Sequence, residues 1–512
     1  MTFLTRRHFL AGTATTLAMA ALPASVAETR AQTRTRIDVT TRTLEVNGKA
    51  AKVFGLAQPD GTRGLYARQG DRFAVDLVNR LDEPTLVHWH GLTPPWQQDG
   101  VPEVTQPAIP AGERFAYDFE LRTPGTHWMH SHYGLQEQGL LSAPLIIRSK
   151  KDEVVDEQEI VVELNDFSFT PADEILDRLR SESGADAMAG MAGMGTDTAA
   201  MKDQVDQGSQ PRAGMSMPNS APMPGMQKAD KSGQGSGNMI AMPMAMTMDV
   251  NDIDFDAYLA NDRTLDDPEV FDVERGGQLR LRIINGAAST NFTVDLGDID
   301  GQLIAVDGNE IEPVWLKRVP LAMAQRADIR LKMPIDGRSR GILFLREGGA
   351  ERSGIVLRPP RAKVSRISVE SSKNGPLVDL SLERHLSATK TLPVRTPDRR
   401  ILFHLTGAMG GYVWGWRTDG PFRVLRGERV EIDLQNDTMM SHPMHLHGHH
   451  FQVVAINGVR MKGAMRDTVL VPPGTTVAIA FDADNPGHWA FHCHNLYHMA
   501  VGMMTTLEYQ SA

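Results

Sequence analysis

Four pairs of histidines separated by a single residue are the most distinctive feature of the sequence. The pairs are His88 and His90, His130 and His132, His445 and His447, and His492 and His494. With 17 histidines in 512 residues, chance predicts only about one such pair or fewer. On a strand, residues i and i+2 point to the same face, so each pair directs two imidazoles one way. Eight imidazoles are too many for one metal ion, and neutral imidazole suits copper, zinc, iron or nickel, so the pairs leave the metal open.

The last pair flanks the only cysteine of the chain, Cys493. A strand places this cysteine on the face opposite to its two neighbours, towards a different site. His498 follows five residues later, Met503 five residues after that, and His442 precedes the third pair. Two imidazoles, a thiolate and a thioether are the donor set of a blue-copper electron-transfer site. The pattern therefore indicates a copper at Cys493, joined through a few covalent bonds to a metal cluster on the other face.

A repeated strand-like segment must position these residues. Residues 70–79, 276–285 and 427–436 each begin with glycine, end with asparagine and alternate apolar with polar side chains, which is typical of a half-buried strand. In the first and third copies a His-x-His-Gly motif follows nine residues after the asparagine, but the second copy has none. A chain of 512 residues exceeds one hydrophobic core. We therefore predict an all-β fold of three related β-sandwiches, the middle one without metal ligands.

The first 27 residues predict an export signal. Arg6 and Arg7 precede an apolar stretch that runs to Leu22, and residues 25–27 form a small-residue cleavage site. Paired arginines ahead of Phe-Leu resemble the twin-arginine signal, whose pathway carries folded proteins. We therefore expect the twin-arginine export machinery to deliver the protein to a bacterial periplasm.

Composition argues against several classes of protein. A single cysteine rules out a disulfide framework and any metal site that needs several thiolates. The formal charge of −10 argues against non-specific nucleic-acid binding, which depends on clustered lysine and arginine. No apolar run beyond the N-terminus approaches the roughly 20 residues of a membrane span. We expect a monomer with no nucleic acid as partner and no membrane span.

A methionine-rich segment at about residues 183–248 breaks the strand pattern. It is rich in Gly, Ala, Ser, Pro and Met, and it contains 13 of the chain's 27 methionines. This composition predicts a flexible insertion. Thioethers are soft ligands that prefer Cu(I), so the segment favours a role in binding that ion.

Four motifs together resemble those of the multicopper oxidases. They are His88-Trp-His90-Gly, His130-Ser-His132, His442-Pro-Met-His445-Leu-His447-Gly, and His492-Cys493-His494-x3-His498-x4-Met503. The resemblance covers nearly all of the chain after the signal. It implies three Greek-key cupredoxin-like domains at residues 36–150, 155–362 and 375–512, with the methionine-rich insertion inside the second. It also implies four copper ions per chain, three of them in a cluster between the first and third domains.

The resemblance implies a ligand set for each copper type. Type 1 copper takes His442, Cys493, His498 and Met503; type 2 copper takes His88 and His445; the type 3 pair takes His90, His130, His132, His447, His492 and His494. Electrons would enter at type 1 copper, pass through Cys493 and reduce dioxygen to water at the cluster. Asp99 lies at the family position of a carboxylate that assists proton delivery; the less favoured alternative is a turn residue before Gly100.

The sequence leaves the reducing substrate open. In the first interpretation the protein oxidises Cu(I) to Cu(II) in copper tolerance, and the substrate ion binds to Met242, Met244, Met246, Met248 and Met440. In the second interpretation it is a laccase-like oxidase of phenols and diphenols, and the insertion is only a linker. A third interpretation, a non-enzymatic periplasmic copper-binding protein, fits the complete ligand sets less well.

Overall fold

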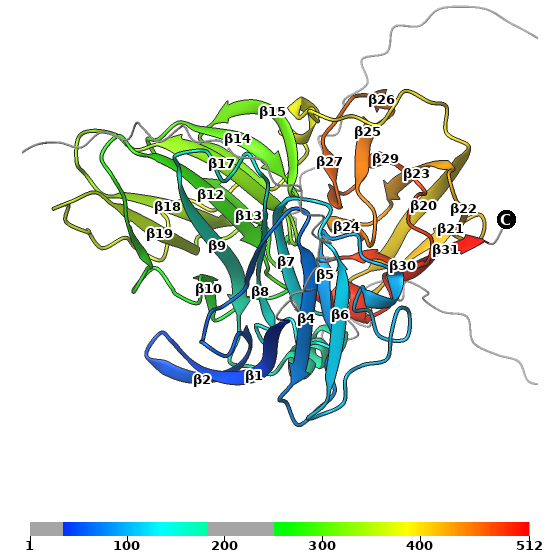
Figure 1. Cartoon of the computed structure of the whole chain (residues 1–512), viewed down its shortest axis with the longest axis horizontal. Coiled ribbons are helices and arrows are strands. Elements are labelled where there is room, and N and C mark those ends of the chain that lie inside the picture. Colours follow the sequence, from blue (N-terminus) through cyan, green and yellow to red (C-terminus); the bar gives the residue numbers. More distant parts are fainter. Residues whose placement is uncertain (1–33, 182–249, 511–512) are drawn as a thin grey trace, which may run out of the picture.

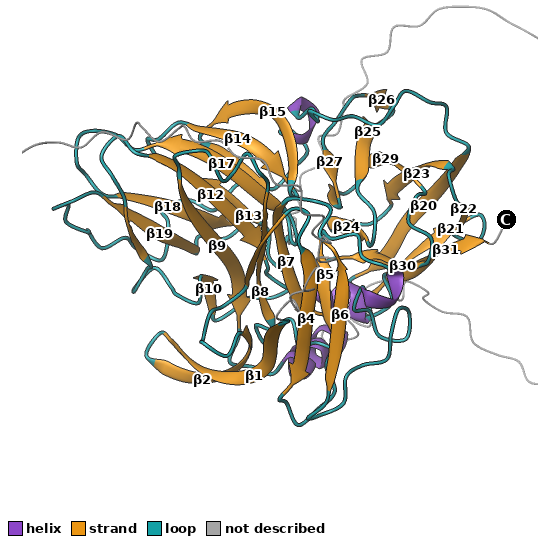
Figure 2. Cartoon of the chain, in the orientation of Figure 1, coloured by secondary structure: helices purple, strands orange, loops and turns teal. Residues whose placement is uncertain are grey.

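The computed structural model describes residues 34–181 and 250–510. Within them, six β-sheets form three pairs, each built from one stretch of the chain and called here domains 1, 2 and 3 (Figure 1). Figure 2 shows that strands make up almost all of the regular structure and that the helices are short. The predicted all-β fold of three sandwiches is confirmed. The predicted signal at 1–27 and the methionine-rich segment at 183–248 lie outside the described residues.

Domain 1 consists of two four-stranded sheets. In spatial order the first contains β2 (Lys49–Ala57), β1 (Thr35–Val46), β4 (Arg72–Asn79) and β6 (Arg114–Glu120). The second contains β3 (Leu65–Arg68), β8 (Ser142–Arg148), β7 (Gly125–Ser131) and β5 (Val87–His90). Trp89 of the second sheet contacts Phe73 and Tyr117 of the first, with ring centroids 4.8 Å apart in both pairs. The two sheets therefore pack face to face around an aromatic core.

Domain 2 pairs a six-stranded with a five-stranded sheet. The larger sheet contains β10 (Ala257–Ala260), β9 (Gln158–Phe167), β12 (Gln278–Asn285), β17 (Arg326–Lys332), β14 (Gly301–Val306) and β15 (Asn309–Leu316). The smaller contains β11 (Val270–Asp272), β19 (Arg352–Arg358), β18 (Arg340–Arg346), β13 (Phe292–Asp295) and β16 (Arg318–Leu321). Leu281 and Ile329 of the larger sheet share one buried cluster with Phe344 of the smaller, so this domain has a core of its own.

Domain 3 contains the two sheets nearest the C-terminus. The larger consists of β21 (Val413–Thr418), β20 (Arg399–Ala408), β23 (Arg429–Asn436), β29 (Thr476–Asp482), β25 (Phe451–Ile456) and β26 (Val459–Arg460), with β27 (Met465–Arg466) also paired to β25. The smaller consists of β22 (Arg423–Leu425), β31 (Met504–Gln510), β30 (His488–Cys493), β24 (His442–Leu446) and β28 (Thr468–Val471). Phe403 and Phe491 join the two sheets, with their ring centroids 5.3 Å apart.

The repeated segment forms the same strand in all three domains. β4, β12 and β23 each begin two residues after the glycine and end at the asparagine. Asn79, Asn285 and Asn436 are buried, and the Nδ2 of each donates to two backbone carbonyls. The Oδ1 of each accepts a hydrogen bond from the backbone N–H two residues later in the chain. The side chain therefore satisfies backbone groups of the turn that leaves the strand. The repeat encodes a turn as well as a strand.

Short helices connect the sheets. They include η1 (Trp96–Gln98), η2 (Glu383–His385), α2 (Leu496–Ala500) and a helical stretch at residues 172–181. In that stretch Ile175 and Leu179, four residues apart and so on one helix face, belong to the core of domain 3. None of the helices in the described part of the chain is long and apolar enough to cross a membrane.

Candidate metal centre

Antiparallel strand pairs in domains 1 and 3 present the eight paired histidines. In domain 1, β5 and β7 place His88 directly opposite His130. In domain 3, β24 and β30 place His445 opposite His492 in the same way. The second histidine of each pair lies two residues further along. His90 is still on β5, whereas His132, His447 and His494 directly follow β7, β24 and β30. The pairs therefore occupy equivalent positions in the two domains.

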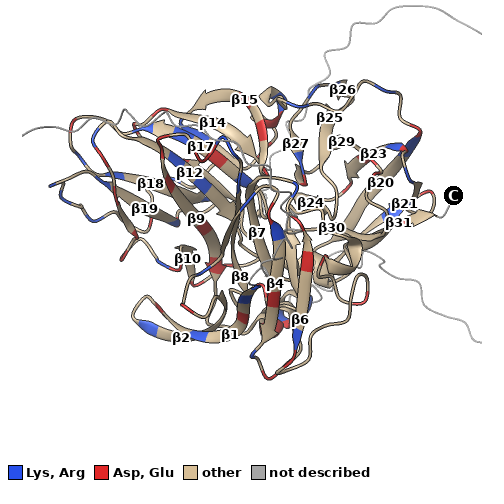
Figure 3. Ribbon diagram, viewed as in Figure 1, with Lys and Arg blue, Asp and Glu red and all other residues tan. Residues whose placement is uncertain are grey.

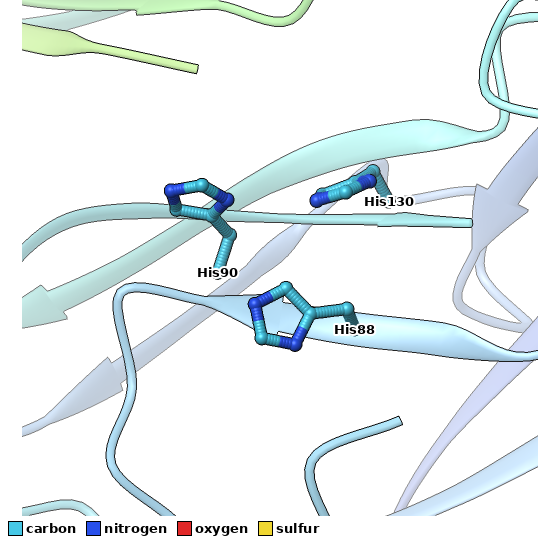
Figure 4. A group of neighbouring side chains, drawn as sticks. All are labelled: His88, His90 and His130. Atoms are coloured by element: carbon cyan, nitrogen blue, oxygen red, sulfur yellow. The ribbon is translucent and has the colours of Figure 1, made fainter. Parts of the chain in front are cut away.

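The two sets meet between domains 1 and 3. Three nitrogens, one each from His132, His447 and His492, converge: His492 Nε2 lies 2.9 Å from His447 Nε2 and 3.4 Å from His132 Nε2. Ring nitrogens of His88, His90 and His130 lie within 4.8 Å of one another, and Figure 4 shows these three imidazoles gathered over β5 and β7. Further groups with the same spacing join histidines of both domains, namely His88 with His445 and His447, and His90 with His445 and Asp467.

Five of these imidazoles present a buried nitrogen without a hydrogen-bond partner. The atoms are Nε2 of His88, His130, His445 and His494, and Nδ1 of His90. An unsatisfied buried polar atom costs about 1–3 kcal/mol, so five of them in one place would be unfavourable without a ligand. A metal ion satisfies such lone pairs directly. The residues present therefore fit a cluster of imidazole-bound metal ions.

Hydrogen bonds from the opposite nitrogen fix which atom each histidine offers. His88 Nδ1 donates to Asp99 O and His445 Nδ1 donates to Asp467 O, both at 2.8 Å. A carbonyl oxygen only accepts, so Nδ1 carries the proton and Nε2 keeps its lone pair. In His90 the roles are reversed, because Nε2 donates to Asp467 Oδ1 at 3.1 Å and Nδ1 is left free. Such outer hydrogen bonds orient metal ligands.

Three buried carboxylates surround the imidazoles. Asp99 Oδ2 accepts a 2.8 Å hydrogen bond from His447 Nδ1, and Glu137 Oε2 lies 2.7 Å from His130 Nδ1. Asp467, described above, is the third. Burial raises the pKa of Glu137 well above its ordinary value. Asp99, predicted from the sequence, follows η1 and is fully buried, and its Oδ1 accepts no hydrogen bond. The sequence analysis missed Glu137 and Asp467, whose spacing from the histidine pairs follows no repeated pattern.

Burial favours the neutral form of seven of the eight clustered histidines. Burial is the largest cause of the lowered pKa values, and mutual repulsion between imidazoles adds to it. The pKa is well below its ordinary value for His90, His130, His132, His445, His447 and His494, and about 3 for His492. Neutral imidazole is the form that binds metal, so the cluster is prepared for metal ions.

A second site lies on the other face of β30. Cys493 Sγ is 3.6 Å from His442 Nδ1 and 3.8 Å from His498 Nδ1. Met503 is fully buried. Its backbone is hydrogen-bonded to two other residues of this site: its N–H donates to His498 O, and its carbonyl accepts from Cys493 N–H. Burial raises the pKa of the Cys493 thiol, so a thiolate there requires a cation beside it. Because His492 faces the cluster, two consecutive residues join the two sites.

An aspartate that the sequence analysis did not select closes the second site. His498 Nε2 donates to Asp252 Oδ2 at 2.9 Å, and the Tyr412 hydroxyl donates to the same oxygen at 2.7 Å. Asp252 Oδ1 is buried and has no partner. Nothing in the local sequence marks Asp252, which lies 246 residues from His498.

Asp252 lines a small cleft at the edge of this site. The cleft is lined by Val250, Asp252, Ser289, Asn291, Met323, Glu347, Met439, Met440, Ser441 and Asn495. Met440, which the sequence analysis selected, is 7% exposed, whereas Met439 is 67% exposed. Met242, Met244, Met246 and Met248 lie outside the described residues, but residue 250, at the end of that gap, belongs to the cleft.

Family models described as multicopper oxidase match three parts of the chain, at residues 38–152, 197–340 and 395–512. Together these matches cover most of the sequence. Among curated proteins, the multicopper oxidase MmcO of Mycobacterium tuberculosis is 29% identical over 450 residues, covering 87% of this chain and 81% of its own. A copper resistance protein A homolog of Pseudomonas syringae pv. tomato is 28% identical over 565 residues, covering 92% and 91%.

Solved structures show the same fold. Fet3p, a multicopper oxidase that functions in iron import, superimposes with a TM-score of 0.70 at 18% identity, covering 93% of this chain and 90% of its own. A multicopper oxidase from Pseudomonas thermotolerans gives a TM-score of 0.63 at 22% identity, covering 93% and 98%. The sequence matches, the three sandwiches and the converging imidazoles agree, and the chain belongs to the multicopper oxidase family.

Proposed function

We propose that the chain holds four copper ions and couples the oxidation of Cu(I) to the reduction of dioxygen to water. The proposed ligands are His442, Cys493, His498 and Met503 for type 1 copper, His88 and His445 for type 2, and His90, His130, His132, His447, His492 and His494 for the type 3 pair. Family membership supports copper as the metal. The unpaired ring nitrogens support the cluster, and the thiol between two imidazoles supports the type 1 site.

The bound copper ions supply one-electron transfer at the type 1 site and the reduction of dioxygen at the cluster. The chain's own residues provide the path and the protons. Cys493 connects the type 1 site to His492 and His494 through covalent bonds of the backbone and side chains, so an electron can pass between the two sites through bonds alone. Asp99 lies between the two domains. Its Oδ2 accepts a hydrogen bond from His447 while its Oδ1 accepts none, so Oδ1 is the atom that can hold and pass on a proton.

The observation that carries Cu(I) as substrate is Asp252 with the methionines beside it. One oxygen of Asp252 accepts a hydrogen bond from the type 1 ligand His498, while the other is buried and has no hydrogen-bond partner. Asp252 also lines a cleft together with Met439 and Met440. A carboxylate supplies negative charge and thioethers prefer Cu(I). An ion bound there is one hydrogen bond away from the type 1 ligand.

Two further observations support a supply of Cu(I) to this cleft. The helix at residues 172–181 packs on domain 3, and residue 250 lies in the cleft itself, so the described residues on either side of the methionine-rich segment lie on domain 3 and at the cleft. We propose that Met242, Met244, Met246 and Met248 collect Cu(I) and pass it to Met440. Relatives named copper resistance protein A are consistent with this role.

The test compares two substrates in one variant. Replacing Met439 and Met440 together by leucine keeps the volume of the side chains but removes both thioethers. We expect oxygen uptake with Cu(I) to fall about tenfold or more, while uptake with a diphenol stays within twofold. Met333→Leu, a buried methionine in the core of domain 2, is the matched control and should change neither rate. Equal loss with both substrates, or with neither, would contradict Cu(I) as the substrate and favour a laccase-like oxidation of phenols.

We propose the periplasm as the location. The support is the twin-arginine pattern in residues 1–27, and deletion of those residues should leave the protein in the cytoplasmic fraction of cells that express it. We also propose that the protein acts as a monomer, which light scattering of the mature chain would test.

A further inference from the structure

Domain 2 contributes no histidine to the cluster, yet one of its side chains binds a carboxylate that is hydrogen-bonded to a cluster histidine. We propose that Arg326 of β17 is a positioning residue that holds the cluster ligand His90 in place through Asp467. The inference rests on the copper sites proposed above. It assigns to domain 2 a role in metal binding beyond that of a spacer.

Arg326 and Asp467 form a two-point contact. Nη1 donates to Asp467 Oδ1 at 2.7 Å and Nη2 donates to Oδ2 at 2.5 Å. Asp467 Oδ1 in turn accepts the 3.1 Å hydrogen bond from His90 Nε2. Arg326 and His90 are 0% exposed and Asp467 is 1% exposed. The chain of contacts runs from domain 2 to domain 3 and on to domain 1, without water between its members.

The guanidinium itself cannot turn. Its Nε donates to Thr126 O at 3.1 Å and its Nη1 also donates to Ala324 O at 3.0 Å. The backbone N–H of Arg326 donates to Asp307 Oδ1 at 2.9 Å. A planar fork held on three sides fixes the plane of the carboxylate that it binds. The orientation of Asp467, and with it the direction of the free Nδ1 of His90, is therefore set from domain 2.

The equivalent aspartate on the other side lacks this contact. Asp99 binds His447 as Asp467 binds His90, and the backbone carbonyl of each aspartate accepts from another cluster histidine. The Oδ1 of Asp99 accepts no hydrogen bond and lies 3.4 Å from His88 Nδ1, whereas both side-chain oxygens of Asp467 accept hydrogen bonds from Arg326. Among the described residues, domain 2 therefore holds only one of these two related carboxylates, that of Asp467.

Loss of the fork should weaken one metal position more than the others. Outer residues that orient metal ligands typically contribute about 10- to 100-fold to metal affinity. Without Arg326 the Asp467 carboxylate can rotate, and His90 can turn its Nδ1 away from the cluster. The type 1 site should be unaffected, because none of its proposed ligands contacts Asp467 among the described residues.

The experiment compares two buried arginines of the same sheet. Arg282 on β12 is also 0% exposed and also contacts Thr126, but its acidic partners are Asp328, Glu159 and Asp152. Figure 3 shows basic residues on both of these neighbouring strands. Arg326→Met and Arg282→Met each remove one buried guanidinium. The copper-loaded proteins are titrated with a copper chelator, while type 1 copper is followed by its blue absorption and the type 3 pair by its near-ultraviolet absorption.

We expect Arg326→Met to lose the type 3 signal at a chelator concentration about 10- to 100-fold lower than the native protein needs, with the type 1 signal unchanged. Arg282→Met should lower stability but release copper at the native chelator concentration. A general loss of stability would move both signals together in both variants, so the ratio between the two signals separates positioning from folding.

Arg326→Lys keeps the inference testable if the methionine variant does not fold. Lysine keeps the charge beside Asp467 but cannot form the two-point contact, so we expect a folded protein with an intermediate shift. The positioning role alone would be overturned if Arg326→Lys lost the type 3 signal at the same chelator concentration as the native protein. Equal shifts in the Arg326 and Arg282 variants would overturn it as well. A native protein that shows no type 3 signal after copper loading would overturn the proposed function as well.

Discussion

His447 of domain 3 donates its Nδ1 proton to Oδ2 of Asp99 in domain 1, at 2.8 Å and across 348 residues of sequence. The reciprocal contact joins His90 of domain 1 to Asp467 of domain 3, at 3.1 Å. Each domain therefore orients a histidine of the other. Neither set of imidazoles is complete alone, so the geometry of the cluster depends on the docking of domains 1 and 3.

The first prediction concerns Asp99. Asp99→Asn keeps an acceptor for His447 but removes the group that can exchange a proton. We expect normal copper content and normal reduction of type 1 copper by substrate, with reoxidation by dioxygen slowed about 100-fold. Stopped-flow absorption at the blue band measures both steps. Reoxidation at the native rate would show that Asp99 only shapes the turn before Gly100.

The second prediction concerns the thiol. Cys493→Ser removes the one sulfur that bridges the two sites, so the intense blue colour and almost all turnover should disappear. Cys493 belongs to the buried core of domain 3, but the exchange alters a single atom of one side chain, so the melting temperature of the copper-free variant should stay close to that of the copper-free native protein. Absorption spectroscopy and copper analysis check the result, with up to three cluster coppers retained. A variant that remains blue would exclude Cys493 as the ligand.

The third prediction concerns Met503. Met503→Leu replaces a buried thioether by an alkyl group of similar volume, so packing should change little. Loss of a weak axial donor to oxidised copper should raise the reduction potential of the type 1 site while the blue colour persists. Redox titration of the blue band measures the shift. Met444→Leu, in the same core and next to Cys493 across the strand pair, is the control and should leave the potential unchanged.

The sequence was sufficient for the elements that repeat. The glycine-to-asparagine segment predicted β4, β12 and β23 in their correct places, because strand alternation and a turn-forming asparagine are local properties. The direction of each histidine pair follows from the two-residue period of a strand. The same rule placed Cys493 away from its neighbours, and the structure has it beside His442 and His498.

The residues around the ligands could not be predicted in this way. His90 and Asp467 are 377 residues apart, and His498 and Asp252 are 246 apart. These contacts arise from the docking of whole domains, and no periodicity within a strand encodes them. Arg326 was missed for the same reason, since a single arginine on a strand is usually solvated and only the docking of three domains buries it.

The last prediction concerns acid stability of the copper-free protein. Burial lowers the pKa of His132 well below its ordinary value, so the folded state keeps this imidazole neutral while the unfolded chain binds a proton below about pH 6.5. The unfolded state then holds more protons, and the free energy of unfolding falls as pH drops below that value, by up to about 1.4 kcal/mol per pH unit for each such histidine. Above pH 7 both states are neutral and the effect is absent.

Glu137 acts in the opposite direction, because its raised pKa means that the folded state binds the proton more readily. The histidine contribution is therefore isolated by comparing variants. Urea unfolding of the copper-free protein at pH 7.5 and pH 5.5 should show a smaller loss of stability for His132→Gln than for the native chain. His385→Gln, at an exposed position, should behave as the native chain does. Equal losses in all three proteins would mean that the buried histidines take up protons without unfolding, and the cluster would then be open to water before copper binds.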